Sequence, residues 1–265
     1  MENLSKYLNE SLIKKQGRIQ DKEDLRVKIE DWIQKNVKWN DRWKEYVIND
    51  DLTIDVWGDV NIKTMENLPE YIQFGVAHDE FTIGGELFGE KISKLDSLKG
   101  CPRQCGSFTC RSSSIKNLKG CPEVKSYLYL TDNPKLTSLV GAPKECFTFS
   151  CHSSSIKNLK GCPKVRSDLY VPKNPNLESL EGAPDFARQF DCSDCPKLTS
   201  LKGGPSQVDL KYYCNRCHGL TSCEGLPKKL FMLFALETRQ EFIDDVRKNY
   251  DYNRLKEFNR SVYKE

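Results

Sequence analysis

The chain has 265 residues, of which 41 are basic and 38 acidic, so its net charge is only +3. This balance argues against a dedicated nucleic-acid binder, which needs a large positive surface. No run of about 18 apolar residues is present, so we expect no membrane-spanning segment. The N-terminal stretch also lacks the apolar core of a secretion signal. We therefore expect a cytoplasmic protein whose 12 cysteines remain reduced.

Residues 1–50 carry no repeat, but their apolar residues recur at helical spacing. The two stripes are Leu4, Leu8 and Leu12, followed by Leu25, Ile29, Trp32 and Ile33. A solenoid needs a cap over the apolar edge of its first coil. We predict that residues 1–50 form this helical cap, and a partner-binding helix is the alternative interpretation.

From Leu52 onward the apolar period changes from helical to strand-like. Ile54 alternates with Val56, and Val60 alternates with Ile62. The Gly58-Asp59 pair between them is a hairpin signal. We expect two strands here, within degenerate N-terminal coils of the repeat.

An eleven-residue segment, Ser112–Pro122, recurs letter for letter as Ser153–Pro163. Weaker copies share the kernel aliphatic-x-x-Leu-x-Gly-x-Pro, at steps of 20 to 22 residues. The kernels begin at Leu95, Ile115, Leu136, Ile156, Leu177, Leu198 and Leu220. A fixed period of this length indicates stacked coils that bury their apolar sides against each other. We predict an α+β fold in which residues 51–236 form a solenoid of about nine coils, with a parallel β-sheet on its concave face.

Each coil also carries an alternating apolar pair, which we expect to point into the core from a short strand. The pairs are Phe108/Cys110, Leu128/Leu130, Phe149/Cys151, Leu169/Val171, Phe190/Cys192, Tyr212/Cys214 and Leu233/Ala235. Three residues after the second member stands an Asn, Ser or Cys, which we expect to hydrogen-bond the backbone of adjacent coils where the chain turns. These corner residues are Ser113, Asn133, Ser154, Asn174, Cys195 and Cys217.

Residues 237–265 return to helical spacing. Phe242, Ile243, Val246 and Tyr250 lie on one face, and Leu255 and Phe258 continue it. We predict a helical C-terminal cap.

The repeat resembles the short leucine-rich repeats of bacterial proteins, including the repeat region of type III secreted effectors. It is also similar to repeat proteins of large tailed bacteriophages, through Leu136-Thr-Ser-Leu139, Leu198-Thr-Ser-Leu201 and Gly58-Asp-Val-Asn-Ile62. The likeness covers residues 52 to about 236. It implies the fold and a phage or mobile-element gene, and says little about function because such repeats bind many partners.

Cys192-x-x-Cys195 followed by Cys214-x-x-Cys217 has the spacing of a zinc site. The repeat register explains the same spacing, because each pair occupies a strand position and a corner position of its coil. Buried thiols are ordinary core residues. We favour core cysteines and no cofactor, and keep a zinc-stabilised nucleic-acid binder as an alternative.

Lysines at equivalent positions form a stripe along one turn edge, which we interpret as a solvated surface rather than a phosphate-binding one. They are Lys99, Lys119, Lys160 and Lys202. The three histidines fall in different repeat phases, and no catalytic constellation emerges. We therefore expect no enzymatic activity.

The strand side chains that alternate with the core pairs point outward. Tyrosines and basic residues are frequent among them, as in the energetic centres of protein interfaces. The candidate partner-binding residues are Arg111, Tyr127, Tyr129, His152, Tyr170, Lys211 and Tyr213. The favoured hypothesis is a protein-interaction solenoid, phage- or mobile-element-encoded, that binds a host protein through its concave face and inhibits a defence or regulatory factor. A structural component of a viral particle is a further alternative, and the sequence does not determine the oligomeric state.

Overall fold

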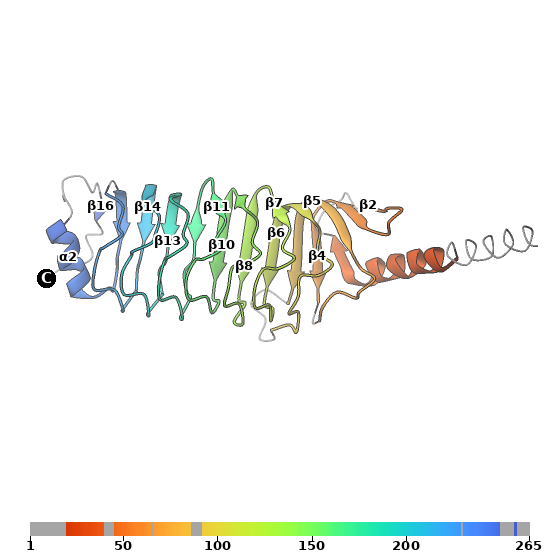
Figure 1. Cartoon of the computed structure of the whole chain (residues 1–265), viewed down its shortest axis with the longest axis horizontal. Coiled ribbons are helices and arrows are strands. Elements are labelled where there is room, and N and C mark those ends of the chain that lie inside the picture. Colours follow the sequence, from red (N-terminus) through yellow and green to blue (C-terminus); the bar gives the residue numbers. More distant parts are fainter. Residues whose placement is uncertain are drawn as a thin grey trace, which may run out of the picture.

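The computed structural model describes residues 20–39, 45–64, 66–85, 92–228, 230–249 and 257–258. Over these ranges the chain winds into an elongated solenoid whose strands stack along the long axis (Figure 1). The prediction of a solenoid with a parallel sheet is confirmed. Within the described ranges, no helix is long and apolar enough to cross a membrane.

The main sheet follows the order of the coils, β1-β4-β5-β6-β8-β10-β12-β13-β14-β15-β16. All neighbouring pairs from β4 to β16 are parallel. The first coil contributes two strands, β3 and β4, which together count as one level of the sheet. From this level to β15 the sheet has nine levels, and the chain makes about eight turns between the first and the last. The strands are β3 (Ile54–Trp57), β4 (Val60–Lys63), β5 (Phe74–Gly84), β6 (Gln104–Arg111), β8 (Tyr127–Thr131), β10 (Thr148–His152), β12 (Leu169–Tyr170), β13 (Phe186–Asp191), β14 (Gln207–Tyr213), β15 (Leu230–Phe234) and β16 (Glu257–Phe258).

Three shorter strands lie just ahead of the main strand of their coils. They are β7 (Glu123–Val124), β9 (Glu145–Cys146) and β11 (Lys164–Val165). β7 pairs with β6, and β9 pairs with β11, again in parallel.

The core is a set of columns that run along the solenoid axis. All members of the seven predicted apolar pairs are buried. Aromatic first members contact each other or a ring of a neighbouring coil: Phe108 stacks on Phe81 of the preceding coil with centroids 6.2 Å apart, and Phe190 meets Tyr212 edge-on at 4.9 Å. The kernel residues Leu136, Leu139 and their equivalents form the opposite wall. Each coil therefore buries its apolar residues against the coils on either side, as a repeat of this period requires.

At the end of each main strand from β6 to β15 the chain turns through one residue with a positive φ, between 47° and 58°. None of these residues is glycine, although this left-handed conformation is unfavourable for other residues. They are Ser112, Asp132, Ser153, Lys173, Asp194, Arg216 and Glu237. The sequence did not predict this feature. The turn directs the next residue, the Asn, Ser or Cys of the corner, back into the core.

The buried corner side chains connect each coil to the one before it. Asn174 accepts the backbone N–H of Ser154 (2.9 Å) and donates to the carbonyls of Cys151 and Val171 (both 2.9 Å). A cysteine at the corner makes an equivalent bond through its thiol. The bonds to the preceding coil run from Asn133 to the carbonyl of Cys110 (3.0 Å), from Asn174 to Cys151 (2.9 Å), from Cys195 to Val171 (3.5 Å) and from Cys217 to Cys192 (3.1 Å). The predicted role is confirmed for the Asn and Cys corners. The serine corners differ, because the Ser113 hydroxyl donates to the Asn133 side chain and the Ser154 hydroxyl to the carbonyl of His152 in its own coil.

The kernel glycines form the opposite corner, and all seven have positive φ, between 81° and 96°. They also lie against the backbone of the preceding coil. A Cβ on Gly182 would come within 2.5 Å of the Lys160 nitrogen and 2.6 Å of the Leu159 carbonyl carbon. Glycine is needed here both for the conformation and for the approach of the coils.

The N-terminal end differs from the predicted helical segment 1–50. A helix is described over residues 20–36, where Ile29 and Ile33 are buried and Trp32 packs edge-on against Phe74. The chain then forms β1 (Val37–Trp39) and β2 (Glu45–Ile48), which pair antiparallel with β4 and β3. Edge strands need pairing partners, and β1 and β2 supply them at the first coil. Leu4, Leu8 and Leu12 lie outside the described residues.

The expected hairpin at Gly58-Asp59 is wrong, although both strands exist. β3 and β4 do not pair with each other, because both run parallel to the long strand β5 of the next coil. The bend between them is held by that coil as well. Asp79 accepts the N–H of Gly58 (2.8 Å), and Asp59 accepts the N–H of Glu80 (3.1 Å).

At the C-terminal end, α2 (Gln240–Asn249) buries Phe242, Ile243 and Val246. Phe258 was expected to continue this helical face and instead lies in strand β16, in register with Leu233. The pairing continues the sheet beyond β15, which would otherwise present a free edge. Tyr250 and Leu255 lie outside the described residues.

We predict that Gly182→Ala lowers the free energy of unfolding by at least about 2 kcal/mol, because the alanine would be strained at positive φ and would overlap the preceding coil. Chemical denaturation measures the change. Glu181→Ala is the control: its neighbouring, exposed side chain pairs only with Lys160, so its effect should stay within about 0.5 kcal/mol. Equal stability of the two variants would show that the coils are not in close backbone contact here.

Asn174→Ala should cost about 2–4 kcal/mol, because it leaves the buried N–H of Ser154 and the carbonyl of Cys151 without partners. The matched control is Asn176→Ala, because Asn176 is half-buried and its side chain accepts a bond from Lys197. Asn174→Cys should recover part of the loss, since cysteine makes the bond in later coils. If Asn174→Ala were as stable as Asn176→Ala, the corner bond would not hold the coils together.

Candidate functional site

The outward side chains of the main sheet form a continuous surface, which we call the outer face. The parallel register places equivalent residues of successive coils in rows across the strands. The first row is Glu80, Ser107, Tyr127, Thr148, Asp168, Gln189, Lys211 and Met232. The second row is Thr82, Thr109, Tyr129, Ser150, Tyr170, Asp191, Tyr213 and Phe234. A third row begins with Arg111, Thr131 and His152.

Three aromatic side chains gather in the middle of the outer face. Tyr127 and Tyr129 stack with ring centroids 5.6 Å apart and planes 5° from parallel, and Phe147 meets Tyr127 edge-on at 6.2 Å. Tyr127 is 40% exposed, Tyr129 36% and Phe147 44%. These three residues, the aromatic patch, leave large apolar surfaces in water, and such clusters mark interaction sites.

Phe147 is not among the residues predicted from the sequence. It lies between β9 and β10 and outside the alternating pair of its coil. Hydrogen bonds align it with Ser126 of the preceding coil and Ser167 of the next. A phenylalanine therefore stands where its neighbours have serine. Comparison of that column across the coils would have revealed it.

Tyr170 and Tyr213 lie on the same face but outside the aromatic patch. Tyr170 is half-buried and two strands from Tyr129, with the small Ser150 between them. Burial, with Asp168 as the next cause, raises the pKa of Tyr170 to about 12. Tyr213 stacks on Phe234 at 4.6 Å, four strands from β8. The tyrosines thus form separate groups rather than one patch.

The predicted basic residues are also separated. Arg111 and His152 lie in the third row, where His152 bonds the Thr131 hydroxyl (3.1 Å). Burial lowers the pKa of His152, and the Arg111 Nε atom is buried without a hydrogen-bond partner. Lys211 lies on β14, beside Tyr213. The structure therefore places all seven predicted residues on one face and brings only Tyr127 and Tyr129 together.

The turn-edge lysines are largely paired with glutamates of neighbouring coils. Lys160 contacts Glu181 at 3.0 Å, and Lys202 contacts Glu224 at 3.2 Å. Lys99 makes a longer pair with Glu70. Glu181 and Glu224 occupy the position that holds lysine in other coils, and they are the counter-ions of Lys160 and Lys202, so the edge is far less positive than its lysines suggest.

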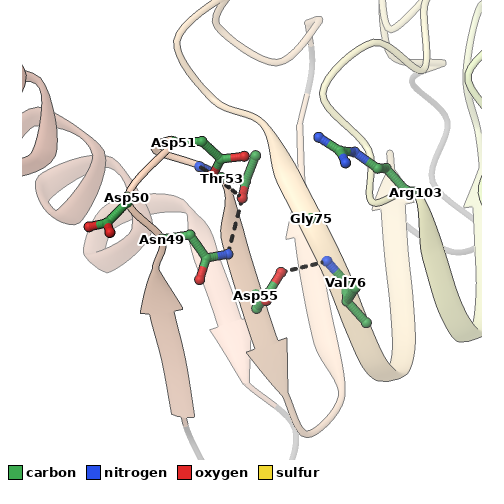
Figure 2. Close-up of a pocket in the computed structure, with 8 residues that line it drawn as sticks. All are labelled: Asn49, Asp50, Asp51, Thr53, Asp55, Gly75, Val76 and Arg103. Carbon is green, nitrogen blue, oxygen red and sulfur yellow. Dashed lines mark hydrogen bonds between the residues drawn. The ribbon is translucent and has the colours of Figure 1, made fainter.

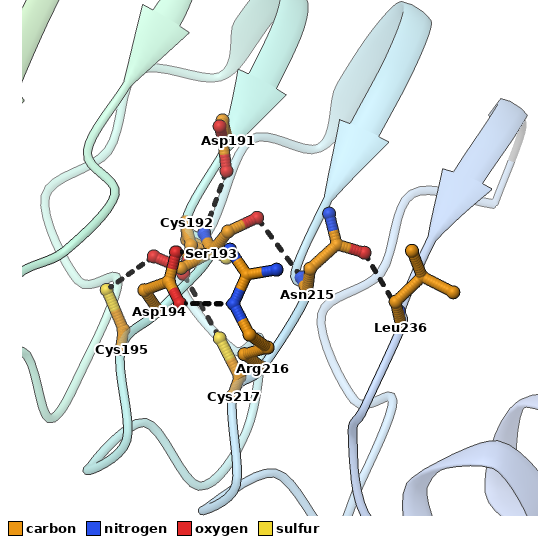
Figure 3. Close-up of polar contacts among 9 residues, drawn as sticks. All are labelled: Asp191, Cys192, Ser193, Asp194, Cys195, Asn215, Arg216, Cys217 and Leu236. Atoms are coloured by element: carbon orange, nitrogen blue, oxygen red, sulfur yellow. Dashed lines mark hydrogen bonds and ion pairs between the residues drawn. The ribbon is translucent and has the colours of Figure 1, made fainter.

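The cysteines of the zinc-like motif are buried, and their corner thiols donate to backbone carbonyls (Figure 3). Burial raises the pKa of Cys192, Cys195 and Cys214, whereas the hydrogen bond with Cys192 lowers the pKa of Cys217. A metal would require the thiolate forms. Among the described residues, no group of three or more His, Cys, Asp or Glu side chains is placed to hold a metal ion, and all 12 cysteines are free.

The polar residues around these cysteines hold the coils in register. Arg216 forms a bidentate pair with Asp194 of the preceding coil, at 2.6 and 2.7 Å (Figure 3). Ser193 accepts the N–H of Asn215 (3.1 Å), and Asn215 accepts the N–H of Leu236 (2.8 Å). These groups are occupied by contacts between coils, so this region is structural.

An open pocket of about 450 Å³ lies near the N-terminal end, lined by Asn49, Asp50, Asp51, Thr53, Asp55, Gly75, Val76 and Arg103 (Figure 2). Its carboxylates are engaged locally. Asp51 accepts the N–H and hydroxyl of Thr53, which lowers the pKa of Asp51, and Asp55 accepts the N–H of Val76. A Cβ at Gly75 would lie 2.3 Å from the Asp55 carboxylate. The pocket therefore reflects the packing of the first coils, and the aromatic patch is the stronger candidate site.

No protein-family model, curated protein or solved structure matches the chain.

Proposed function

We propose that the chain is a non-catalytic protein-interaction solenoid that binds a partner protein through its outer face. The observation that carries this proposal is the aromatic patch, Tyr127, Tyr129 and Phe147, exposed on the main sheet. Aromatic side chains that are exposed in the free protein and become buried against a partner contribute strongly to the binding free energy. The patch lies on parallel strands whose register is fixed by the core, so it loses little freedom on binding.

The repeat supports a finer assignment. The Leu-x-x-Leu-x-Gly-x-Pro kernel and the buried Asn or Cys corner agree with a short leucine-rich repeat. The helices at the two ends, which bury Ile29 and Ile33 at one end and Phe242 and Val246 at the other, fit the role of caps. We assign the solenoid to the leucine-rich-repeat-like class with helical caps as part of this proposal.

The biological setting follows from the resemblance to phage repeat proteins. We propose a phage or mobile-element protein that acts in the cytoplasm of the host cell and inhibits a defence or regulatory factor. The unpaired, buried cysteines suit a reducing compartment. The pairing of turn-edge lysines with glutamates supports a protein partner over nucleic acid, because it leaves less positive charge free on that edge.

The proposal predicts that the triple variant Tyr127→Ala, Tyr129→Ala, Phe147→Ala weakens partner binding by about 2 kcal/mol or more, roughly 30-fold. Each side chain is exposed, so thermal melts should show only small losses of stability, about 0.5 kcal/mol a site. The measurement is affinity capture from host cells, identification of the captured protein by mass spectrometry, and titration of that protein against both forms.

Lys119→Ala with Lys160→Ala is the matched control on the turn edge. It should change neither binding nor stability appreciably, because both lysines are exposed and lie off the outer face. Loss of binding in the lysine variant, with full binding in the aromatic variant, would move the site to the turn edge.

A further inference from the structure

The aromatic patch lies between two carboxylates of the first row. Glu80 is on β5, two strands before Tyr127, and Asp168 directly precedes β12, two strands after it. Parallel strands are about 4.8 Å apart, so each carboxylate-bearing residue lies about 10 Å from Tyr127 along the row. A ligand that covers the tyrosine rings will therefore meet negative charge on both sides.

Within the described ranges, neither carboxylate is paired with a cation. Glu80 accepts hydroxyl bonds from Thr82 and Thr109, both at 3.0 Å, which hold its side chain over the face. Asp168 has one carboxylate oxygen, Oδ1, buried without a hydrogen-bond partner. The ion pairs found across the described ranges involve neither residue.

The rest of the outer face adds to this imbalance. From β5 to β13 the first two rows contain a third carboxylate, Asp191, and no lysine or arginine. The cations of the face lie outside this part of the two rows: Arg188 is exposed on β13 and aligned with Ser167 in the column of Phe147, Arg111 is in the third row, and Lys211 is on β14, four strands from Tyr127. The molecule as a whole is slightly basic, so the negative character is local to this surface.

We propose that the partner presents a cationic segment to the aromatic patch, with one arginine or lysine side chain lying on the Tyr127 and Tyr129 rings and neighbouring cationic side chains of the segment reaching Glu80 on one side and Asp168 on the other. This deepens the proposed function and rests on it. A neutral or acidic partner would desolvate the two carboxylates without supplying a compensating charge. A segment with several cationic side chains spans the row and compensates both carboxylates, and its central cation is also attracted to the faces of the tyrosine rings.

The test uses the full-length protein and two fluorescein-labelled peptides, tetra-arginine and its neutral counterpart tetra-citrulline, in anisotropy titrations. We expect tetra-arginine to bind about tenfold more tightly or better, and to weaken as salt is raised. Glu80→Gln with Asp168→Asn should weaken tetra-arginine about tenfold, and Tyr127→Ala with Tyr129→Ala should do the same. Tyr127→Phe with Tyr129→Phe keeps the rings and should bind as the parent does.

The matched charge control is Glu178→Gln with Glu224→Gln, which removes two carboxylates from the turn edge. It should leave binding unchanged. Equal affinity for the two peptides, or equal losses from the outer-face and turn-edge carboxylate pairs, would overturn the proposal. Melting curves confirm that each variant is folded, and both carboxylate replacements keep the size of the side chain.

The same variants separate this inference from the proposed function. If the captured host protein is lost with the aromatic triple variant but binds Glu80→Gln/Asp168→Asn normally, the outer face is the site and the cationic partner is wrong. If the aromatic triple variant still binds that protein, the proposed function itself is wrong.

Discussion

The structure depends on the buried bonds from the Asn and Cys corner side chains to the coil before them. The corner breaks the backbone ladder, because one residue adopts positive φ and the next enters the core. Carbonyls such as those of Cys151 and Cys192 would then be buried without partners, at a cost comparable to a lost hydrogen bond. Asn174 and Cys217 satisfy them from the next coil. One side chain thus completes the turn and fixes the stacking of two coils.

This stacking determines what the outer face presents. Because every main strand is parallel to the next and held in register, a residue's row is set by its position in the coil. Tyr127 and Tyr129 are two residues apart on β8, so both point outward and their rings stack. Phe147 joins them from the next coil because the chain there is aligned with Ser126. The aromatic patch is therefore held by core packing that none of its members takes part in.

The sequence predicts the features that lie within one coil. The period, the buried pairs such as Phe149/Cys151 and the corner Asn174 follow from local pattern, and the structure confirms them. The predictions that were wrong concern features that depend on contacts with a neighbouring coil. Gly58-Asp59 has the composition of a hairpin turn, but its hydrogen bonds come from Asp79 and Glu80 on β5. Phe258 has the spacing of a helix, but the open edge of β15 draws it into a strand.

The candidate site was predictable only in part for a related reason. Structural demand in a solenoid is periodic, so a side chain needed for stacking recurs at its position, as the kernel leucines and glycines do. The outer rows do not recur: Tyr127, Thr148, Asp168 and Lys211 are equivalent in register and unlike in chemistry. The alternation along a strand predicts that these side chains point outward. It does not predict which of them contact each other across neighbouring coils. A residue that departs from the repeat is a better indicator of a binding site. Phe147 is exposed where the neighbouring coils have serine, and the stacking of the coils does not require a phenylalanine there.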